Sequence, residues 1–105
     1  MPKQIIWSPL AESDFEKILD YLDKNWKMKV AAHFIDLTEN LINQISLNPR
    51  QFPICYKRKN VRKCVLTKHN TLFYRDTRSS IQILRIYDTR QNPDTDGNSI
   101  KPLGR

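Results

Sequence analysis

Two stripes of hydrophobic residues in the first half of the chain have the three-to-four-residue spacing of amphipathic helices. The first helix should begin after Ser8, a suitable N-cap, with Pro9 at the first helical position, where no N–H is needed. The polar run 27–29 should separate the helices and 48–49 should end the second, so that each spans about 17 residues. The stripes are Phe15, Ile18, Leu19, Leu22 and Trp26, and Ala31, Phe34, Leu37, Thr38, Leu41 and Ile45.

Runs rich in β-branched and aromatic residues, the usual composition of strands, dominate the second half. They cover 61–67, 71–76 and 81–88, and the polar clusters between them are long enough only for tight turns. This pattern predicts an antiparallel three-strand meander, with Asn70 accepting a left-handed backbone in the first turn. A further short strand is expected at 3–7.

Two amphipathic helices alone would have only each other to cover their apolar stripes. The sheet supplies the missing surface, which predicts an α+β fold: an N-terminal strand, then an antiparallel two-helix hairpin packed on one face of a small antiparallel sheet completed by a C-terminal three-strand meander. At 105 residues the chain should form a single domain, 1–105. Residues 91–105, rich in Asn, Asp, Pro and Gly, are expected to be an irregular tail.

Strand alternation decides which side chains share a face of the predicted meander. Both faces receive apolar residues, and since the helices cover only one, the other should remain a mixed aromatic and basic binding surface. Which set faces outward stays open, because a single bulge would exchange the two. The alternation separates Leu72 and Tyr74 from Phe73 and Arg75, and Leu84 and Ile86 from Ile83, Arg85 and Tyr87.

The connection 48–60 contains two prolines, which argue against regular structure there. Trp7 and Trp26 each lie at the end of an apolar segment and are expected in the core or at its rim. His33 is expected on the surface or at the edge of the second helix. The apolar side chains that should hold the connection against the core are Phe52, Ile54 and Tyr56.

The net charge of +7 is unevenly distributed. Residues 1–48 carry five lysines against seven acids, whereas residues 49–105 carry thirteen basic side chains against four acids. A basic second half favours an anionic partner such as nucleic acid, the ribosome or an acidic protein, the alternative being a basic surface that serves solubility. The candidate binding residues are Lys57, Arg58, Lys59, Arg62, Lys63, Lys68, Arg75, Arg85 and Arg90.

Several functional classes lack their signatures in this sequence. The two cysteines, Cys55 and Cys64, and two histidines do not have the spacing of a zinc site, so reduced thiols and no metal or cofactor are expected. No apolar run approaches the roughly 20 residues of a membrane span, and the start lacks the pattern of a signal peptide, so we expect a cytoplasmic protein without a membrane partner.

Catalytic motifs of the common hydrolases and nucleotide-binding enzymes are also missing. Cleavage of RNA by its own 2′-hydroxyl requires a base, an acid and positive charge at the phosphate, which Lys, Arg and Tyr can supply without histidine. Basic residues on strands equally serve plain binding, so both interpretations stay open. The candidates for such chemistry are Arg62, Lys63, Lys68, Tyr87 and Arg90.

The ordered set IIWSPLAESDFEKILDYL, NPRQFP, VRKCVLTKHNTLFYR and ILRIYDTRQNP resembles the RelE/ParE superfamily of bacterial type II toxins, specifically its ParE-like branch. The resemblance spans nearly the whole chain. It implies a small toxin that is encoded beside an antitoxin gene. The antitoxin protein would wrap around the toxin and suppress it. It also implies one of two activities: ribosome-dependent mRNA cleavage, as in RelE-like members, or poisoning of DNA gyrase, as in ParE-like members.

The RelE-like nuclease pattern is only partly matched. Arg62 matches a basic position of the second strand of that family's sheet, and Arg90 matches the arginine after the last strand, but Cys64 and Thr71 replace two further basic residues, and the tail has no tyrosine. Such losses should cost a nuclease several powers of ten, at about 1.4 kcal/mol for each tenfold. The resemblance therefore implies a ParE-like toxin acting on DNA gyrase or another protein or protein–DNA target. The alternatives are an mRNA endonuclease using Arg62, Lys63 and Arg90, and a degenerate member that only binds its antitoxin.

Overall fold

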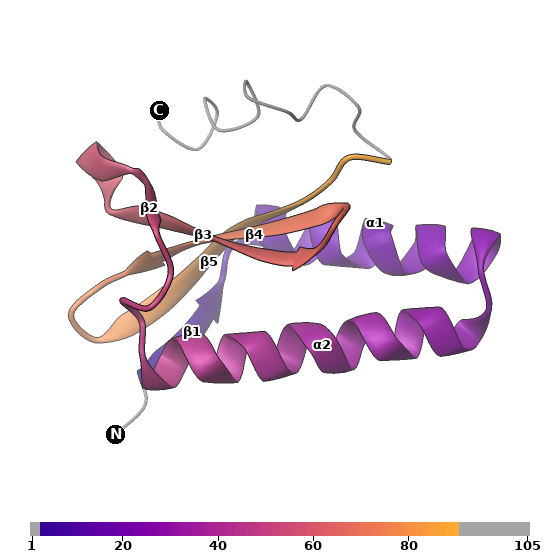
Figure 1. Cartoon of the computed structure of the whole chain (residues 1–105), viewed down its shortest axis with the longest axis horizontal. Helices are drawn as coiled ribbons and strands as arrows, with labels where there is room; N and C mark the ends of the chain where they lie inside the picture. The colour runs from indigo at the N-terminus through magenta and orange to yellow at the C-terminus, as the bar shows by residue number, and fades with distance from the viewer. Residues whose placement is uncertain (1–2, 91–105) are drawn as a thin grey trace.

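The computed structural model describes residues 3–90 and contains two helices and five strands (Figure 1). The predicted tail, 91–105, lies outside the described residues. Each predicted helix and strand is present, with ends that coincide with the expectation or differ from it by up to three residues. In chain order the elements are β1 (Gln4–Trp7), α1 (Pro9–Asn25), α2 (Met28–Leu47), β2 (Ile54–Tyr56), a 3₁₀ turn (Lys57–Lys59), β3 (Val61–Thr67), β4 (Asn70–Asp76) and β5 (Ser80–Asp88).

The five strands form one sheet in the order β1-β5-β4-β3-β2. The meander β3-β4-β5 is antiparallel, as predicted, but β1 pairs with β5 in parallel, with Gln4 opposite Ser80 and Trp7 opposite Ile83. The sheet is therefore mixed, and the expectation of an antiparallel sheet was wrong for this pair. The direction in which β1 joins β5 is a long-range choice, on which the local pattern of either strand carries no information.

The start of α1 confirms the predicted cap. The Ser8 hydroxyl oxygen accepts a hydrogen bond from the Ala11 N–H at 3.0 Å, and Pro9 occupies the first helical position. The same hydroxyl donates to the Leu84 carbonyl at 2.8 Å, while the Ser8 N–H donates to the Ile83 carbonyl at 2.9 Å. Because Ser8 bonds to the helix and to β5 at once, it fixes the point where α1 leaves the sheet.

Both helices pack on one face of the sheet, as predicted, and form the main core with it (Figure 1). Trp7 lies at the rim of this core, its ring centroid 5.3 Å from that of Phe15. Trp26 is 56% exposed, so its expected burial was wrong. It follows the last turn of α1, where the helical hairpin extends past the sheet and has no strand to pack against (Figure 1). The buried core residues are Ala11, Ile18, Leu22, Phe34, Ile42, Ile45, Cys64, Leu66, Leu72, Tyr74, Ile81, Ile83 and Ile86.

A bulge in β5 changes the predicted distribution of side chains between the two faces. Phe73 pairs with Arg85 but the next residue, Tyr74, pairs with Ile83, so Leu84 is the extra residue on β5. As a result Ile83 and Ile86 both face the helices, and Leu84 packs against the cluster of Val61, Phe73 and Tyr87 on the opposite face. The expected grouping of Leu84 with Ile86 was therefore wrong.

The connection between α2 and β3 is more regular than expected. Ile54–Tyr56 forms a short strand, β2, that pairs antiparallel with β3. The two prolines precede this strand and so do not interrupt its hydrogen bonds. Among the described residues, the positive backbone φ occurs at Asn60 (φ 54°), after the 3₁₀ turn, and not at Asn70, which is buried at the start of β4.

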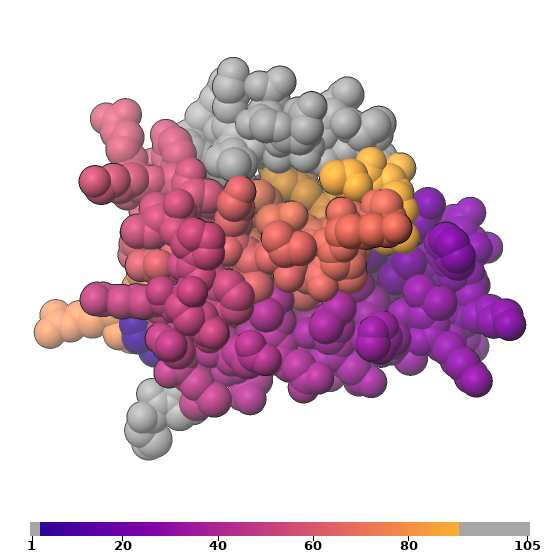
Figure 2. Space-filling view, in the orientation of Figure 1, coloured from indigo at the N-terminus to yellow at the C-terminus, as the bar shows by residue number. Residues whose placement is uncertain are grey.

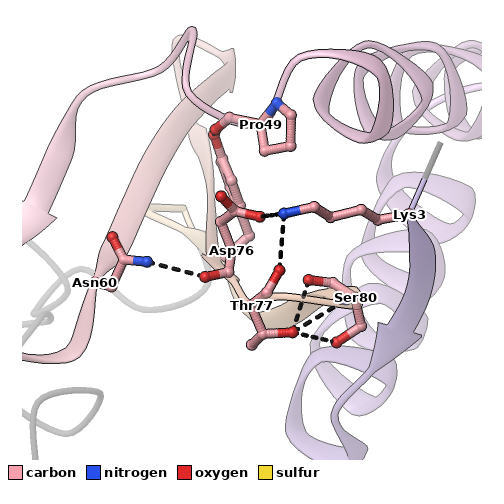
Figure 3. A network of polar contacts seen from close by, with 7 residues as sticks. Lys3, Pro49, Asn60, Asp76, Thr77 and Ser80 are labelled. Atoms are coloured by element: carbon pink, nitrogen blue, oxygen red, sulfur yellow. Dashed lines mark hydrogen bonds and ion pairs between the residues drawn. The ribbon is translucent and has the colours of Figure 1, made fainter. Parts of the chain in front are cut away.

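A polar network closes the end of the sheet where β4 turns into β5 (Figure 3). Lys3 donates to the Asp76 carboxylate at 2.5 Å and to the Thr77 carbonyl at 2.8 Å, and the Asn60 amide donates to the Asp76 carbonyl at 2.9 Å. Ser80 and Thr77 form reciprocal hydrogen bonds across the turn. The network joins the residue before β1 and the residue before β3 to one hairpin.

Candidate binding surface

The sheet face opposite the helices carries a second, smaller apolar cluster. Its centre is an edge-to-face pair of Phe73 and Tyr87, with ring centroids 5.3 Å apart, beside Val61. All three side chains are buried, so the aromatic part of the expected binding surface is not exposed. Because side chains of a strand point to alternate faces, Lys63 and Val65 lie on the same face of β3 as Val61, and both are exposed.

Arg62, a candidate of both the nuclease and the binding interpretations, points to the other face. It lies on the helix-facing side of β3 with Cys64 and Leu66. Its guanidinium donates to the Phe52 carbonyl at 2.7 Å, and its buried Nε has no partner among the described residues. Arg62 thus holds the loop before β2 against the sheet, a role that the pattern of basic residues did not indicate.

Cys64 and Tyr74 lie close to Arg62 on the same face, and burial governs their ionisation. Burial raises the pKa of the Cys64 thiol to about 11. It also raises the pKa of Tyr74 to about 12, against the opposing effect of the Arg62 charge. The Tyr74 hydroxyl donates to the Pro49 carbonyl at 2.6 Å. Both side chains are neutral at physiological pH, and Tyr74 holds the loop through its hydrogen bond to Pro49 and its contact with the Phe52 ring.

Arg85 is bound to the first helix. Its Nε and Nη2 donate to the two oxygens of Asp14 at 2.8 and 3.1 Å, and the Ile86 N–H donates to Asp14 at 3.0 Å. The guanidinium also lies over the Tyr87 ring, 4.9 Å from its centroid. The hydrogen bond to Asp14 raises the pKa of Arg85, and burial raises the pKa of Tyr87 although Arg85 opposes this. A raised pKa leaves less of Tyr87 in the deprotonated form that a general base requires.

Arg90 forms a compact ion pair just after β5. Its Nε and Nη2 donate to the carboxylate of Asp88 at 3.2 and 3.1 Å, its backbone N–H donates to the same group at 2.8 Å, and its guanidinium lies 5.2 Å from the centroid of the Tyr21 ring. Burial of Asp88 favours the neutral acid, but the hydrogen bonds from Arg90 outweigh it, so the pKa of Asp88 lies below its usual value.

Arg75, on the face opposite the helices, is similarly engaged. Its Nε donates to the Lys59 carbonyl at 2.8 Å and its Nη1 to the Gln82 side chain at 3.2 Å. The candidate set therefore divides in two. Four arginines make hydrogen bonds within the fold, namely Arg62, Arg75, Arg85 and Arg90. Five candidates are exposed, namely Lys57, Arg58, Lys59, Lys63 and Lys68.

The exposed candidates do not gather at one point. The 3₁₀ turn Lys57–Lys59 belongs to a segment that projects at one end of the molecule, coloured pink in Figure 2. Lys68 lies in the β3–β4 turn, beside a pocket that also receives His33 and His69. Sequence reasoning missed this pocket, since the two histidines are far apart in the chain and come from different elements. Within residues 3–90, no three His, Cys, Asp or Glu side chains are grouped so that they could hold a metal ion.

The architecture is that of small toxins from toxin–antitoxin systems. A solved structure titled "Chromosomal ParDE TA system from P. aeruginosa" has a TM-score of 0.69 at 19% identity, covering 82% of this chain and 95% of that chain. A YoeB/ParE toxin from Agrobacterium tumefaciens has a TM-score of 0.60 at 12% identity, and the match covers 81% of this chain and 96% of that toxin. A chain of the E. coli DinJ–YafQ toxin–antitoxin complex has a TM-score of 0.57 at 16% identity, and the match covers 87% of this chain and 97% of that chain. At these identities the likeness concerns the fold.

The family itself follows from the sequence match. Residues 5–93 match the family model described as the ParE toxin of the type II toxin-antitoxin system, parDE. The chain therefore belongs to the ParE toxin family, within the RelE/ParE superfamily, which confirms the resemblance seen in the sequence. No curated protein matches the chain significantly by sequence. Within the described part of the chain, neither helix has the length and apolarity needed to cross a membrane.

Proposed function

We propose that this ParE-family toxin inhibits growth by binding DNA gyrase or another protein or protein–DNA target, without cutting RNA. The observation that carries the proposal is the position of Arg62. This residue matches the nuclease pattern, yet its guanidinium lies on the helix-facing side of β3 and donates to the Phe52 carbonyl at 2.7 Å. A phosphate would have to displace that bond and reach the covered face of the sheet.

The other nuclease candidates support the same conclusion. Arg90 is ion-paired to buried Asp88 at 3.1 Å, which neutralises much of its charge. Tyr87 has a raised pKa and is buried. Lys63 is exposed on the open face of β3, but a single lysine supplies neither the second proton-transfer group nor the surrounding charge that cleavage requires. The residues suit binding better than catalysis.

We further propose that the partner that neutralises the toxin is an acidic, amphipathic antitoxin segment that orders as it binds. The exposed cations of the 3₁₀ turn, with Lys63 and Lys68, would attract it. Exposed charges steer association more than they add affinity. The association rate with the product of the small open reading frame adjacent to the toxin gene should therefore fall as salt rises, and a rate indifferent to ionic strength would contradict the electrostatic part of the proposal.

A supercoiling assay with purified gyrase tests the target. The native toxin should inhibit supercoiling, and a variant with Lys57, Arg58 and Lys59 each changed to Glu should inhibit it less. A matched control places the same charge reversal on the helices, at Lys17, Lys24 and Lys29, and should inhibit as the native protein does. Full gyrase activity at an excess of native toxin would refute the gyrase proposal.

Primer extension on mRNA from cells that express the toxin tests the alternative. Intact transcripts are expected if the toxin only binds its target. A ladder of cuts in translated mRNA would instead identify an endonuclease. If the cuts disappeared with Lys63→Ala but not with Arg62→Met, the activity would be assigned to the sheet face opposite the helices. Unaffected growth, with retained antitoxin binding, would indicate a member that only binds its antitoxin.

A further inference from the structure

A pocket of about 200 Å³ lies between the helical hairpin and the β3–β4 turn. The turn points toward the end of the molecule at which the two helices are joined (Figure 1). The floor of the pocket is apolar and the side chains above it are basic or polar. Its apolar lining is Leu22, Val30, Phe34 and Leu37. Its polar lining is His33, Thr67, Lys68, His69, Asn70 and Arg90.

The size of the pocket favours a side chain over a small-molecule ligand. Sites for drug-sized ligands usually measure roughly 300–1,000 Å³, and this pocket is smaller, at about 200 Å³. One large apolar side chain presented by a partner is a better match to such a volume and floor. Single anchors of this kind, seated in preformed pockets, carry much of the energy of protein interfaces.

The rim carries an exposed positive charge. Lys68, in the β3–β4 turn, is exposed, and no Asp or Glu is among the described residues that line the pocket. Arg90 is held in place by its ion pair with Asp88 and by the ring of Tyr21, so the exposed positive charge at the rim is that of Lys68. A partner that carries carboxylates beside its apolar anchor would therefore meet complementary charge here.

The surface beside the pocket is also unusually apolar. Met28 is 77% exposed and Trp26 is 56% exposed, and both precede the pocket residue Val30 by a few positions, where α1 joins α2. Exposed aromatic and methionine side chains in one place are typical of protein interaction sites. Apolar side chains are thus exposed at the end of the hairpin, a few residues from the pocket residue Val30.

We propose that this pocket receives a large apolar side chain of the antitoxin, flanked in that partner by a carboxylate that pairs with Lys68. The proposal rests on the proposed function, because it assumes an acidic antitoxin. It adds the point of attachment: the hairpin end and the β3–β4 turn, away from the more strongly basic 3₁₀ turn.

The two histidines provide a direct test, because the chain contains no others and both line the pocket. Their imidazole signals in an NMR spectrum of the native protein report on this site alone, and the His33→Gln variant assigns them. Titration with the purified product of the adjacent open reading frame should shift both signals. Titration with a short single-stranded RNA should leave both in place, and shifts with RNA but not with the protein would overturn the proposal.

Variants separate this proposal from the one on which it rests. Val30→Trp should fill the pocket and weaken antitoxin binding by roughly tenfold or more. Lys68→Glu should reverse the charge at the rim and weaken binding by roughly threefold or more. Arg78→Glu, the same charge change in the exposed β4–β5 turn and outside the pocket lining, should alter it by less than about twofold. Circular dichroism verifies that the variants fold. If the native toxin does not bind the product at all, the antitoxin proposal fails; if it binds and the three variants behave alike, only the pocket assignment fails.

Discussion

Removal of Asp14 should destabilise the fold because its carboxylate joins α1 to β5. It accepts three hydrogen bonds, from Arg85 Nε at 2.8 Å, Arg85 Nη2 at 3.1 Å and the Ile86 N–H at 3.0 Å. The side chains of Arg85 and Asp14 are only 20% and 13% exposed. The Asp14→Ala variant would leave the guanidinium and a backbone N–H in a poorly hydrated site without their acceptor.

The magnitude follows from this burial. Removing one partner of a fully buried ion pair costs roughly 3–5 kcal/mol, whereas exposed pairs contribute about 1 kcal/mol or less. Partial access of water places Asp14→Ala between these limits, at about 2–3 kcal/mol. Since 1 kcal/mol lowers Tm by about 4–8 °C in a domain of this size, the melting temperature should fall by about 10 °C or more.

Urea unfolding, followed by circular dichroism and by the fluorescence of Trp7 and Trp26, measures the loss. A double-mutant cycle with Arg85→Met isolates the coupling between the two side chains, which should be about 1–2 kcal/mol. Asp20→Ala, an exposed acid on the same helix, is the control and should change the unfolding free energy by less than about 0.5 kcal/mol. A loss below about 1 kcal/mol for Asp14→Ala, or no coupling, would refute the structural role of the pair.

Three further outcomes are expected. Burial raises the pKa of Cys64 to about 11, so at pH 8 a disulfide reagent should label Cys55 first and Cys64 only on unfolding; equal rates would contradict this. Because the folded pKa of Asp88 is lowered, ionised Asp88 stabilises the fold fully above about pH 4, and this stabilisation is lost as the pH falls through the folded pKa. The unfolding free energies of the native protein and Asp88→Asn, measured against pH, should therefore converge in acid. Ser8→Ala should lower the free energy of unfolding in urea by about 1–2 kcal/mol. Ser8→Asp keeps the cap but cannot donate to the Leu84 carbonyl, so its unfolding free energy should lie between those of the native protein and Ser8→Ala.

The local elements of this protein were readable from its sequence because their causes are local. The Ser8–Pro9 pair starts α1, and the spacing of residues such as Ile18 and Leu22 gives each helix an apolar side. β-Branched and aromatic runs give the meander, and its excess of apolar residues requires a helical cover. These signals act within a few residues, so neither the partner strand nor the final position of the element is needed to interpret them.

The tertiary structure decided which residues each element meets. The bulge at Leu84 determined the faces of β5, and the parallel joining of β1 made the sheet mixed. It also decided the role of each cation: the sequence gives Arg62 and Lys63 as neighbours of equal charge, yet only Arg62 turns to the helix side and binds a loop carbonyl. Hydrogen-bond partners of a side chain are set by packing between distant segments, so composition predicts how much positive charge a chain carries but not how much of it reaches the surface.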